Sequence, residues 1–135
     1  MKGSTRDSII NVTRRYGFEV VTKPNKEDLY KKLLALRHAT LTSNIYIDKT
    51  AGISKAGEIN YLKIAVHPEI FRQDFERSCI GINSAINQKT KINLHSHSGF
   101  SGFPYVEGYN EPVAKAYTVD DLESLASLLL HIIDS

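Results

Sequence analysis

The sequence predicts a single α+β domain, residues 1–135, in which a largely antiparallel sheet is packed by N-terminal helices and one C-terminal helix. Helical periodicity occupies the two ends of the chain, whereas the middle alternates with the period of two that strands require. A regular alternation of strands with helices, which would indicate a parallel sheet, is absent. A length of 135 residues with 41% hydrophobic and 24% charged residues matches one globular domain.

The first helix is expected from Ser4 to Tyr16, because apolar residues recur on one helical face and Gly17 follows the last of them. A short strand should follow at 18–21, where β-branched residues gather. Asn25 can then cap a second helix.

The second helix is expected to bury a stripe formed by Leu29, Leu33 and Leu36. On that reading Lys31 and Lys32 lie away from the stripe and face solvent.

The central residues predict strands at 45–47 and 59–66, joined as a hairpin by a long connection with a basic tip that carries Lys55. Pro68 can occupy the first position of a further helix. More strands are expected at 91–95 and 114–117.

The last helix should begin at a cap formed by Thr118, with Asp121 three residues later. Its buried face is expected to consist of apolar residues at helical spacing, namely Leu122, Leu125, Ala126, Leu129 and Ile132 or Ile133.

Charge is distributed unevenly along the chain. Residues 1–63 hold 12 basic and 6 acidic residues, a net charge of +6, whereas residues 64–135 hold 5 and 9, a net charge of −4. A basic surface attracts phosphates and acidic proteins at long range, provided that folding does not mix the two halves into one balanced surface. The residues expected to contact nucleic-acid phosphates are Arg14, Arg15, Lys31, Lys32 and Lys55.

A loop rich in glycine and aromatic residues is predicted over 99–110. If Phe100 and Phe103 were exposed, they could stack on bases beside the basic half of the chain. The alternative is that both rings fold back and fill the hydrophobic core.

The segment 93–98 carries the strongest candidate for chemistry. Alternate side chains of a strand share a face, so Asn93, His95 and His97 should point the same way. The two imidazoles could act as a catalytic acid and base, because histidine titrates near neutral pH. They could also bind a divalent metal such as zinc, or simply form a polar strand edge.

The string Leu94-His95-Ser96-His97-Ser98 resembles the Leu-His-x-His-Ser/Thr signature of polymerase-and-histidinol-phosphatase phosphoesterases over five residues. That resemblance implies a metal-dependent phosphoesterase. In that family the motif lies near the start of a much longer barrel, whereas 37 residues follow Ser98 here, so no family is assigned.

A metal site would need a third ligand besides His95 and His97, and we expect Glu111 to be the first candidate. No spacing rule selects it over the other possible ligands, which are His67, Glu58, Glu69 and Glu107.

A nuclease arrangement with an acid on one strand and an acid-x-Lys on the next is matched poorly. Asp48, Glu58 and Lys63 lie in the right region, but Tyr61 stands where the second acid should be.

Compartment and membrane association follow from what the sequence carries. The lone Cys79 cannot form an internal disulfide, which is typical of a reducing compartment. No apolar stretch approaches the ~20 residues of a membrane span. We therefore expect a cytoplasmic protein without membrane contact.

Three functions remain open. The leading hypothesis is a protein that binds nucleic acid or another phosphorylated partner through its basic N-terminal half, with processing at His95 and His97. The first alternative is a small metal-dependent hydrolase centred on the same histidines. The second is a non-enzymatic immunity-like or accessory module that binds an acidic protein.

Overall fold

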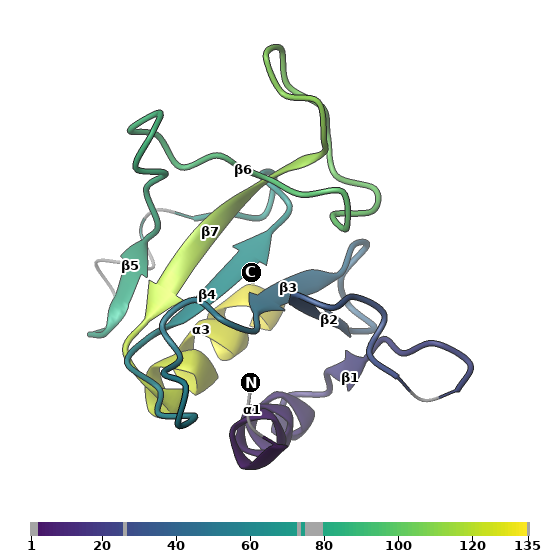
Figure 1. Cartoon of the computed structure of the whole chain (residues 1–135), viewed down its shortest axis with the longest axis vertical. Coiled ribbons are helices and arrows are strands. Elements are labelled where there is room, and N and C mark those ends of the chain that lie inside the picture. The colour runs from purple at the N-terminus through teal and green to yellow at the C-terminus, as the bar shows by residue number, and fades with distance from the viewer. Residues whose placement is uncertain (1–2, 26, 73, 75–79, 135) are drawn as a thin grey trace.

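A computed structural model describes residues 3–25, 27–72, 74 and 80–134. These residues form an α+β domain with two helices and a seven-stranded sheet (Figure 1). In chain order the elements are α1 (Gly3–Arg15), β1 (Glu19–Val20), β2 (Leu33–Arg37), β3 (Ile45–Asp48), β4 (Leu62–Val66), β5 (Ile82–Ser84), β6 (His95–Ser96), β7 (Val113–Val119) and α3 (Leu122–Asp134).

The strand order is β1-β2-β3-β4-β7-β5, and every pair in the sheet is antiparallel. β7 is the longest strand and pairs with β4 along one side. Its other side pairs with β5 near its end and with β6 near its start. The expected α+β class with an antiparallel sheet is confirmed, although one N-terminal helix packs on the sheet where several were predicted.

The predicted second helix is wrong, because Leu33 and Leu36 of its expected stripe lie in strand β2 and Leu29 lies in the irregular segment before it. Leu34 and Leu36 face one hydrophobic cluster, whereas Leu33 and Ala35 face the other. A strand buried on both faces has a continuous apolar run, which periodicity alone cannot distinguish from a buried helix. Lys31 therefore lies in the irregular segment before β2.

The two faces of the sheet carry different cores. The helix face packs against α1 and α3 through the larger cluster, which includes Ile9, Leu34, Ile64, Tyr117 and Leu129 (Figure 1). The opposite face, called here the open face, is covered in part by the 97–112 segment. Its smaller cluster consists of Leu33, Ala35, Tyr46, Ala65, Phe100, Phe103 and Ala114.

The first predicted helix is confirmed as α1, and Gly17 follows it with a φ of +88°. A Cβ atom at Gly17 would lie 2.9 Å from Nε2 of His38, which donates a hydrogen bond to the Tyr16 carbonyl. Both the left-handed backbone and the close ring therefore favour glycine at this helix end.

The last helix is confirmed, but Thr118 does not cap it. Thr118 lies within β7, and Oδ1 of Asp121 accepts a hydrogen bond from the Ser124 backbone N–H at 2.8 Å. Asp121 is thus the cap, one turn later than predicted. The buried face consists of Ser124, Leu125, Leu128, Leu129 and Ile132.

The hairpin between β3 and β4 is confirmed, and the strand predicted at 114–117 is the longer β7. The strand predicted over 91–95 is reduced to β6, because Lys91 takes a positive φ of 62° and interrupts extended backbone. Residues 68–70 form a turn. The rest of the helix predicted from Pro68 extends over residues that lie partly outside the described part of the chain, and Cys79 also lies outside it.

Candidate functional site

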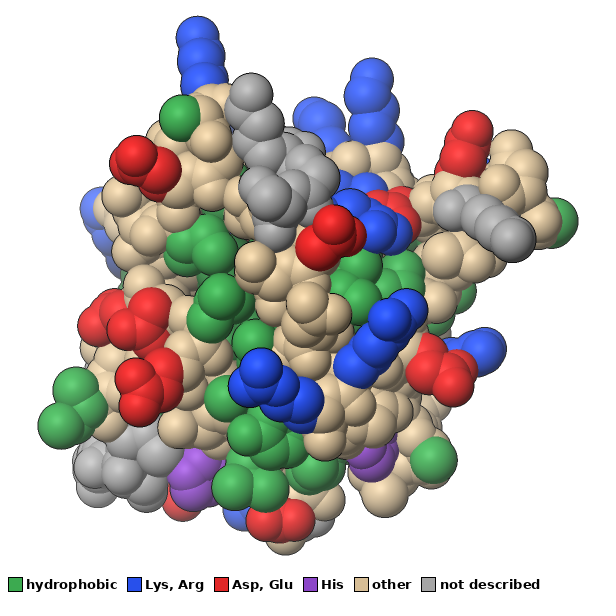
Figure 2. Space-filling model, turned by 90° about the horizontal axis from the view of Figure 1, so that it is seen from below, with side chains coloured by type: hydrophobic (Ala, Val, Ile, Leu, Met, Phe, Trp, Pro, Cys, Tyr) green, Lys and Arg blue, Asp and Glu red, His purple; other side chains and the backbone are tan. Residues whose placement is uncertain are grey.

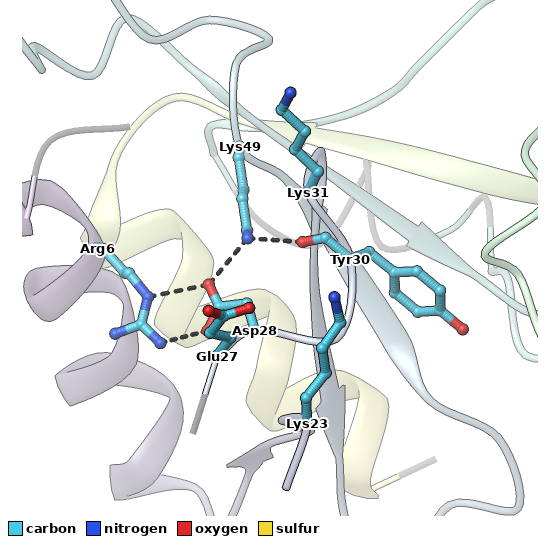
Figure 3. A pocket seen from close by; sticks show the side chains of 7 residues that line it. All are labelled: Arg6, Lys23, Glu27, Asp28, Tyr30, Lys31 and Lys49. Atoms are coloured by element: carbon cyan, nitrogen blue, oxygen red, sulfur yellow. Dashed lines mark hydrogen bonds and ion pairs between the residues drawn. The ribbon is translucent and has the colours of Figure 1, made fainter. Parts of the chain in front are cut away.

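A hollow of about 630 Å³ lies between α1 and the segment that leads into β2 (Figure 3). We call it the cationic groove, and its lining consists of Arg6, Lys23, Glu27, Asp28, Tyr30, Lys31 and Lys49. Four of these seven side chains are basic and two are acidic. The groove therefore holds an excess of positive charge.

The floor of the cationic groove is organised by Asp28. The Arg6 guanidinium donates two hydrogen bonds to its carboxylate, one of them from Nε at 3.1 Å, and Lys49 Nζ lies 2.8 Å from Oδ2. Lys49 also donates to the Tyr30 carbonyl at 2.8 Å. The hydrogen bonds from Arg6 lower the pKa of Asp28 to about 2, with a smaller contribution from Lys49. Asp28 is thus a carboxylate at neutral pH whose charge is compensated twice.

Lys23 and Lys31 form the rim of the groove. Both are exposed, and neither makes an ion pair with any residue that the structure describes. In Figure 3 the Lys31 amine points away from Asp28. Because Asp28 is already bonded to two cations, the rim charges are available to an external anion.

A second hollow of about 630 Å³ continues from the first and shares Arg6 with it. Arg14 stands on its wall, together with Glu19 and the apolar residues of α1 and β1. The Glu19 carboxylate is paired with Arg37 at 3.0 Å. Basic side chains therefore extend the cationic surface along α1.

Of the five predicted phosphate-binding residues, two line the hollows and three lie elsewhere on the surface. Lys31 and Arg14 line the two hollows. Arg15 is exposed in the last turn of α1, Lys32 is exposed next to Lys31, and Lys55 lies in the exposed β3–β4 connection.

Sequence reasoning missed Arg6, Lys23 and Lys49. The high density of basic residues over 1–63 indicates a basic region to which all three belong. Only the fold brings α1, the segment before β2 and the end of β3 together.

The charge halves of the sequence are partly mixed on the surface. On the face drawn in Figure 2, acidic and basic side chains are interspersed with hydrophobic ones. The basic residues of the N-terminal half therefore do not form a continuous basic surface on this face.

Phe100 and Phe103 lie in the core of the open face, each with 4% of its surface exposed. The ring centroid of Tyr46 lies 5.2 Å from that of Phe100 and 5.6 Å from that of Phe103. In this arrangement neither phenylalanine presents a face to solvent for stacking on a base. The geometry corresponds to the core-filling alternative.

His95 is fixed by the backbone. Its Nε2 donates a hydrogen bond to the Ala85 carbonyl at 2.9 Å, which leaves Nδ1 as the acceptor of the neutral ring. Burial lowers the pKa of His95, the hydrogen bond to Ala85 opposes that effect, and the nearby Lys63 adds to it. His95 is therefore held as a neutral imidazole.

His97 uses the opposite nitrogen. Its Nδ1 accepts a hydrogen bond from the Gly99 backbone N–H at 2.8 Å, so that the proton of the neutral ring lies on Nε2. His38 and His67 accept from backbone N–H groups two residues later in the same way. Three histidines thus stabilise turns, a role that the sequence pattern did not indicate.

Asn93 does not join the histidines as a free polar group. Its side chain donates to the Ala116 carbonyl at 3.0 Å and accepts from the Ala116 N–H at 2.8 Å. This two-point contact extends the pairing of β7 beyond β6.

The described residues contain no group of three His, Cys, Asp or Glu side chains placed to hold a metal ion. Glu111 therefore does not complete a three-ligand set with His95 and His97 in the described part of the chain. The geometry gives no support to zinc at this point.

The structure does bring the two histidines into one small cavity of about 100 Å³, called here the open-face cavity. Its polar lining consists of Tyr46, Asp48, Lys63, His95, Ser96 and His97, and its apolar lining of Leu33, Ala65 and Phe100. Asp48 follows Ile47 and Lys63 precedes Ile64, so the antiparallel pairing of Ile47 with Ile64 brings Asp48 and Lys63 to neighbouring positions. Lys63 and His95 also line an adjacent groove of about 500 Å³.

No described helix is long and apolar enough to cross a lipid bilayer. No family model, curated protein or solved structure matches this chain. The interpretation of its function therefore depends on the geometry and charge of these sites.

Proposed function

We propose that the protein binds the phosphate backbone of a nucleic acid along the cationic groove. The observation that supports this proposal is the double compensation of Asp28 by Arg6 and Lys49. It leaves Lys23 and Lys31 free to neutralise phosphates at the rim of the same hollow. Arg14 continues the row along α1.

The proposed roles follow from the chemistry of the side chains. Lys23 and Lys31 contribute exposed ammonium groups, which neutralise phosphates as point charges. Arg6 and Lys49 chiefly hold the groove together through Asp28, so that their loss would disturb its shape as well as its charge. Such contacts position a nucleic acid without reading its sequence.

Charge reversal at the rim tests this proposal. We expect Lys23→Glu together with Lys31→Glu to weaken binding of mixed-sequence oligonucleotides at least tenfold at about 50 mM salt, because each lost phosphate contact removes counterion release. Fluorescence anisotropy with single- and double-stranded DNA and RNA measures the affinity.

The matched control is Lys89→Glu together with Lys91→Glu, two exposed lysines outside both hollows. This control carries the same change in net charge and should retain most of the affinity. Equal losses in the two double variants would contradict a localised groove. An absence of binding by the unaltered protein to any of the four nucleic acids would instead favour an acidic protein partner.

A further inference from the structure

Tyr30 brings an aromatic ring into the lining of the cationic groove. The residue is partly exposed, and its hydroxyl shares a hydrogen bond of 3.1 Å with the hydroxyl of the exposed Ser101. In the view of Figure 3 the ring lies on the side of the groove away from Arg6, beyond the amine of Lys23. An aromatic surface therefore adjoins the rim charges that the proposed function assigns to phosphates.

The Tyr30 ring is held in place from the open face of the sheet. It packs against the smaller hydrophobic cluster, and its centroid lies 6.1 Å from that of Tyr46. A Cβ atom at Gly99 would lie 3.2 Å from Cδ1 of Tyr30, so glycine lets the backbone approach the ring closely. The Tyr30 carbonyl accepts a hydrogen bond from Lys49. A ring fixed in this way loses little conformational entropy when a ligand packs against it.

Charge and aromatic surface meet in one hollow of about 630 Å³. Lys31 follows Tyr30 directly in the chain, and Lys23 lines the same hollow. Because Asp28 is compensated, these two ammonium groups outweigh the remaining carboxylate of the lining, that of Glu27. The combination suits a ligand in which a planar aromatic group is joined to anionic groups, as a base is joined to phosphates in a nucleic acid.

The exposed ring distinguishes between the forms of nucleic acid. In a duplex the faces of the bases are stacked on one another, whereas a single strand can turn them toward aromatic side chains. A duplex would therefore meet the groove through its phosphates and leave Tyr30 unused. Phe100 and Phe103 do not offer an alternative platform, because each is only 4% exposed.

We infer that the cationic groove binds single-stranded nucleic acid, with one base stacked on Tyr30 and the neighbouring phosphates on Lys23 and Lys31. This inference rests on the proposed binding of phosphates at the same groove. The stacked base adds affinity without reading sequence, because every base has a π face. The strand would continue along the second hollow toward Arg14.

Three ligands of equal length separate the base from the phosphates: a single strand, the corresponding duplex, and an abasic strand that keeps sugars and phosphates but lacks bases. The unaltered protein should bind the single strand most tightly. Tyr30→Leu keeps apolar bulk against the open face but removes the ring. It should weaken single-strand binding about fivefold or more, and should change binding of the other two ligands less than about twofold.

A tryptophan reporter shows directly whether a base reaches this position. The chain contains no tryptophan, so Tyr30→Trp introduces a single indole whose fluorescence is quenched when a base stacks on it. The single strand should quench this signal, and the abasic strand should not. The control is Tyr105→Trp at a residue that is 70% exposed and outside both hollows, and its fluorescence should not change. Tyr30→Phe retains the ring and should restore the preference that Tyr30→Leu loses.

Two results would overturn the inference and leave the proposed function standing, provided that Lys23→Glu/Lys31→Glu still weakens binding. One is an unchanged single-strand affinity in Tyr30→Leu. The other is an equal loss for all three ligands in that variant, which would show that Tyr30 only shapes the groove. If the unaltered protein binds none of the ligands, the inference and the proposed function both fail. Each ligand is used as DNA and as RNA, and Tyr30-dependent binding of either single strand supports the inference.

Discussion

Asp28 connects three parts of the chain through one carboxylate. Arg6 reaches it from α1, Lys49 reaches it from the residue after β3, and only 13% of the Asp28 side chain is exposed. An ion pair at this degree of burial is screened less by salt and solvent than a surface pair. Asp28 therefore contributes both to the fold and to the shape of the cationic groove.

The Asp28→Asn variant should be less stable than the unaltered protein by about 2 kcal/mol at pH 7. This estimate converts the lowering of the pKa of Asp28 to about 2 at ~1.4 kcal/mol per pH unit. Because the pKa is lower in the folded state, the stabilisation is present above about pH 4. It is lost as the pH falls toward 2. Urea unfolding at pH 7 and pH 2.5 measures both values.

The control for this prediction is Glu27→Gln, an exposed neighbour that makes no ion pair with the described residues. It should change stability by less than about 0.5 kcal/mol at either pH. A difference between Asp28→Asn and the unaltered protein that stays constant from pH 7 to pH 2.5 would contradict the assigned role of the carboxylate.

Single residues also show where the sequence was informative about the candidate site. The His-x-His pattern singled out His95 and His97, and both rings line the open-face cavity. The pattern could not predict that each ring would bond to the backbone, since those bonds depend on Ala85 and Gly99. Asp48 and Lys63 were considered only for the poorly matched nuclease arrangement, and neither they nor Tyr46 were placed beside the histidines, because that proximity depends on strand pairing.

The type of a secondary-structure element could be predicted where its apolar residues recur on one face. α1 and α3 have apolar residues at helical spacing, so their type follows from the sequence. In β4 the apolar residues Leu62, Ile64 and Val66 share one face, which predicts a strand, although Ala65 on the other face is buried as well. β2 was not predictable in this way, because both of its faces are buried. Its type is set by pairing with β1 and β3, a tertiary effect that overrides local periodicity.

The 97–112 segment makes a second prediction at the scale of an element. Phe100→Ala or Phe103→Ala should each lower the free energy of unfolding by about 3–5 kcal/mol, as expected for a buried aromatic ring. Thermal or chemical denaturation of the single variants measures the loss. Tyr105→Ala is the control, because Tyr105 is 70% exposed and should cost less than about 0.5 kcal/mol.

A small loss of stability in both phenylalanine variants, combined with weaker binding of oligonucleotides, would reverse this interpretation. The two rings would then belong to a stacking surface, and the segment that covers the open face would have to move on binding. A large loss of stability with unaltered binding is the result that the packing of Tyr46 against both rings predicts.

For the whole molecule, the charge separation along the sequence is only partly retained in space. The paired residues Glu19 and Arg37 cancel each other, and Figure 2 shows both signs of charge on one face. What survives is a local excess of basic groups around the cationic groove. Net charge per half of the chain could therefore predict the sign of the field, but not its position.

The salt dependence of oligonucleotide binding tests the central claim most directly. Each phosphate contact contributes about 0.7–0.9 to the slope of log K against log salt. The unaltered protein should bind with an affinity that falls steeply between about 50 and 200 mM salt, and Lys23→Gln/Lys31→Gln should reduce the slope by about 1.5. A slope that is the same in both proteins would contradict the assignment of the cationic groove as the phosphate-binding surface.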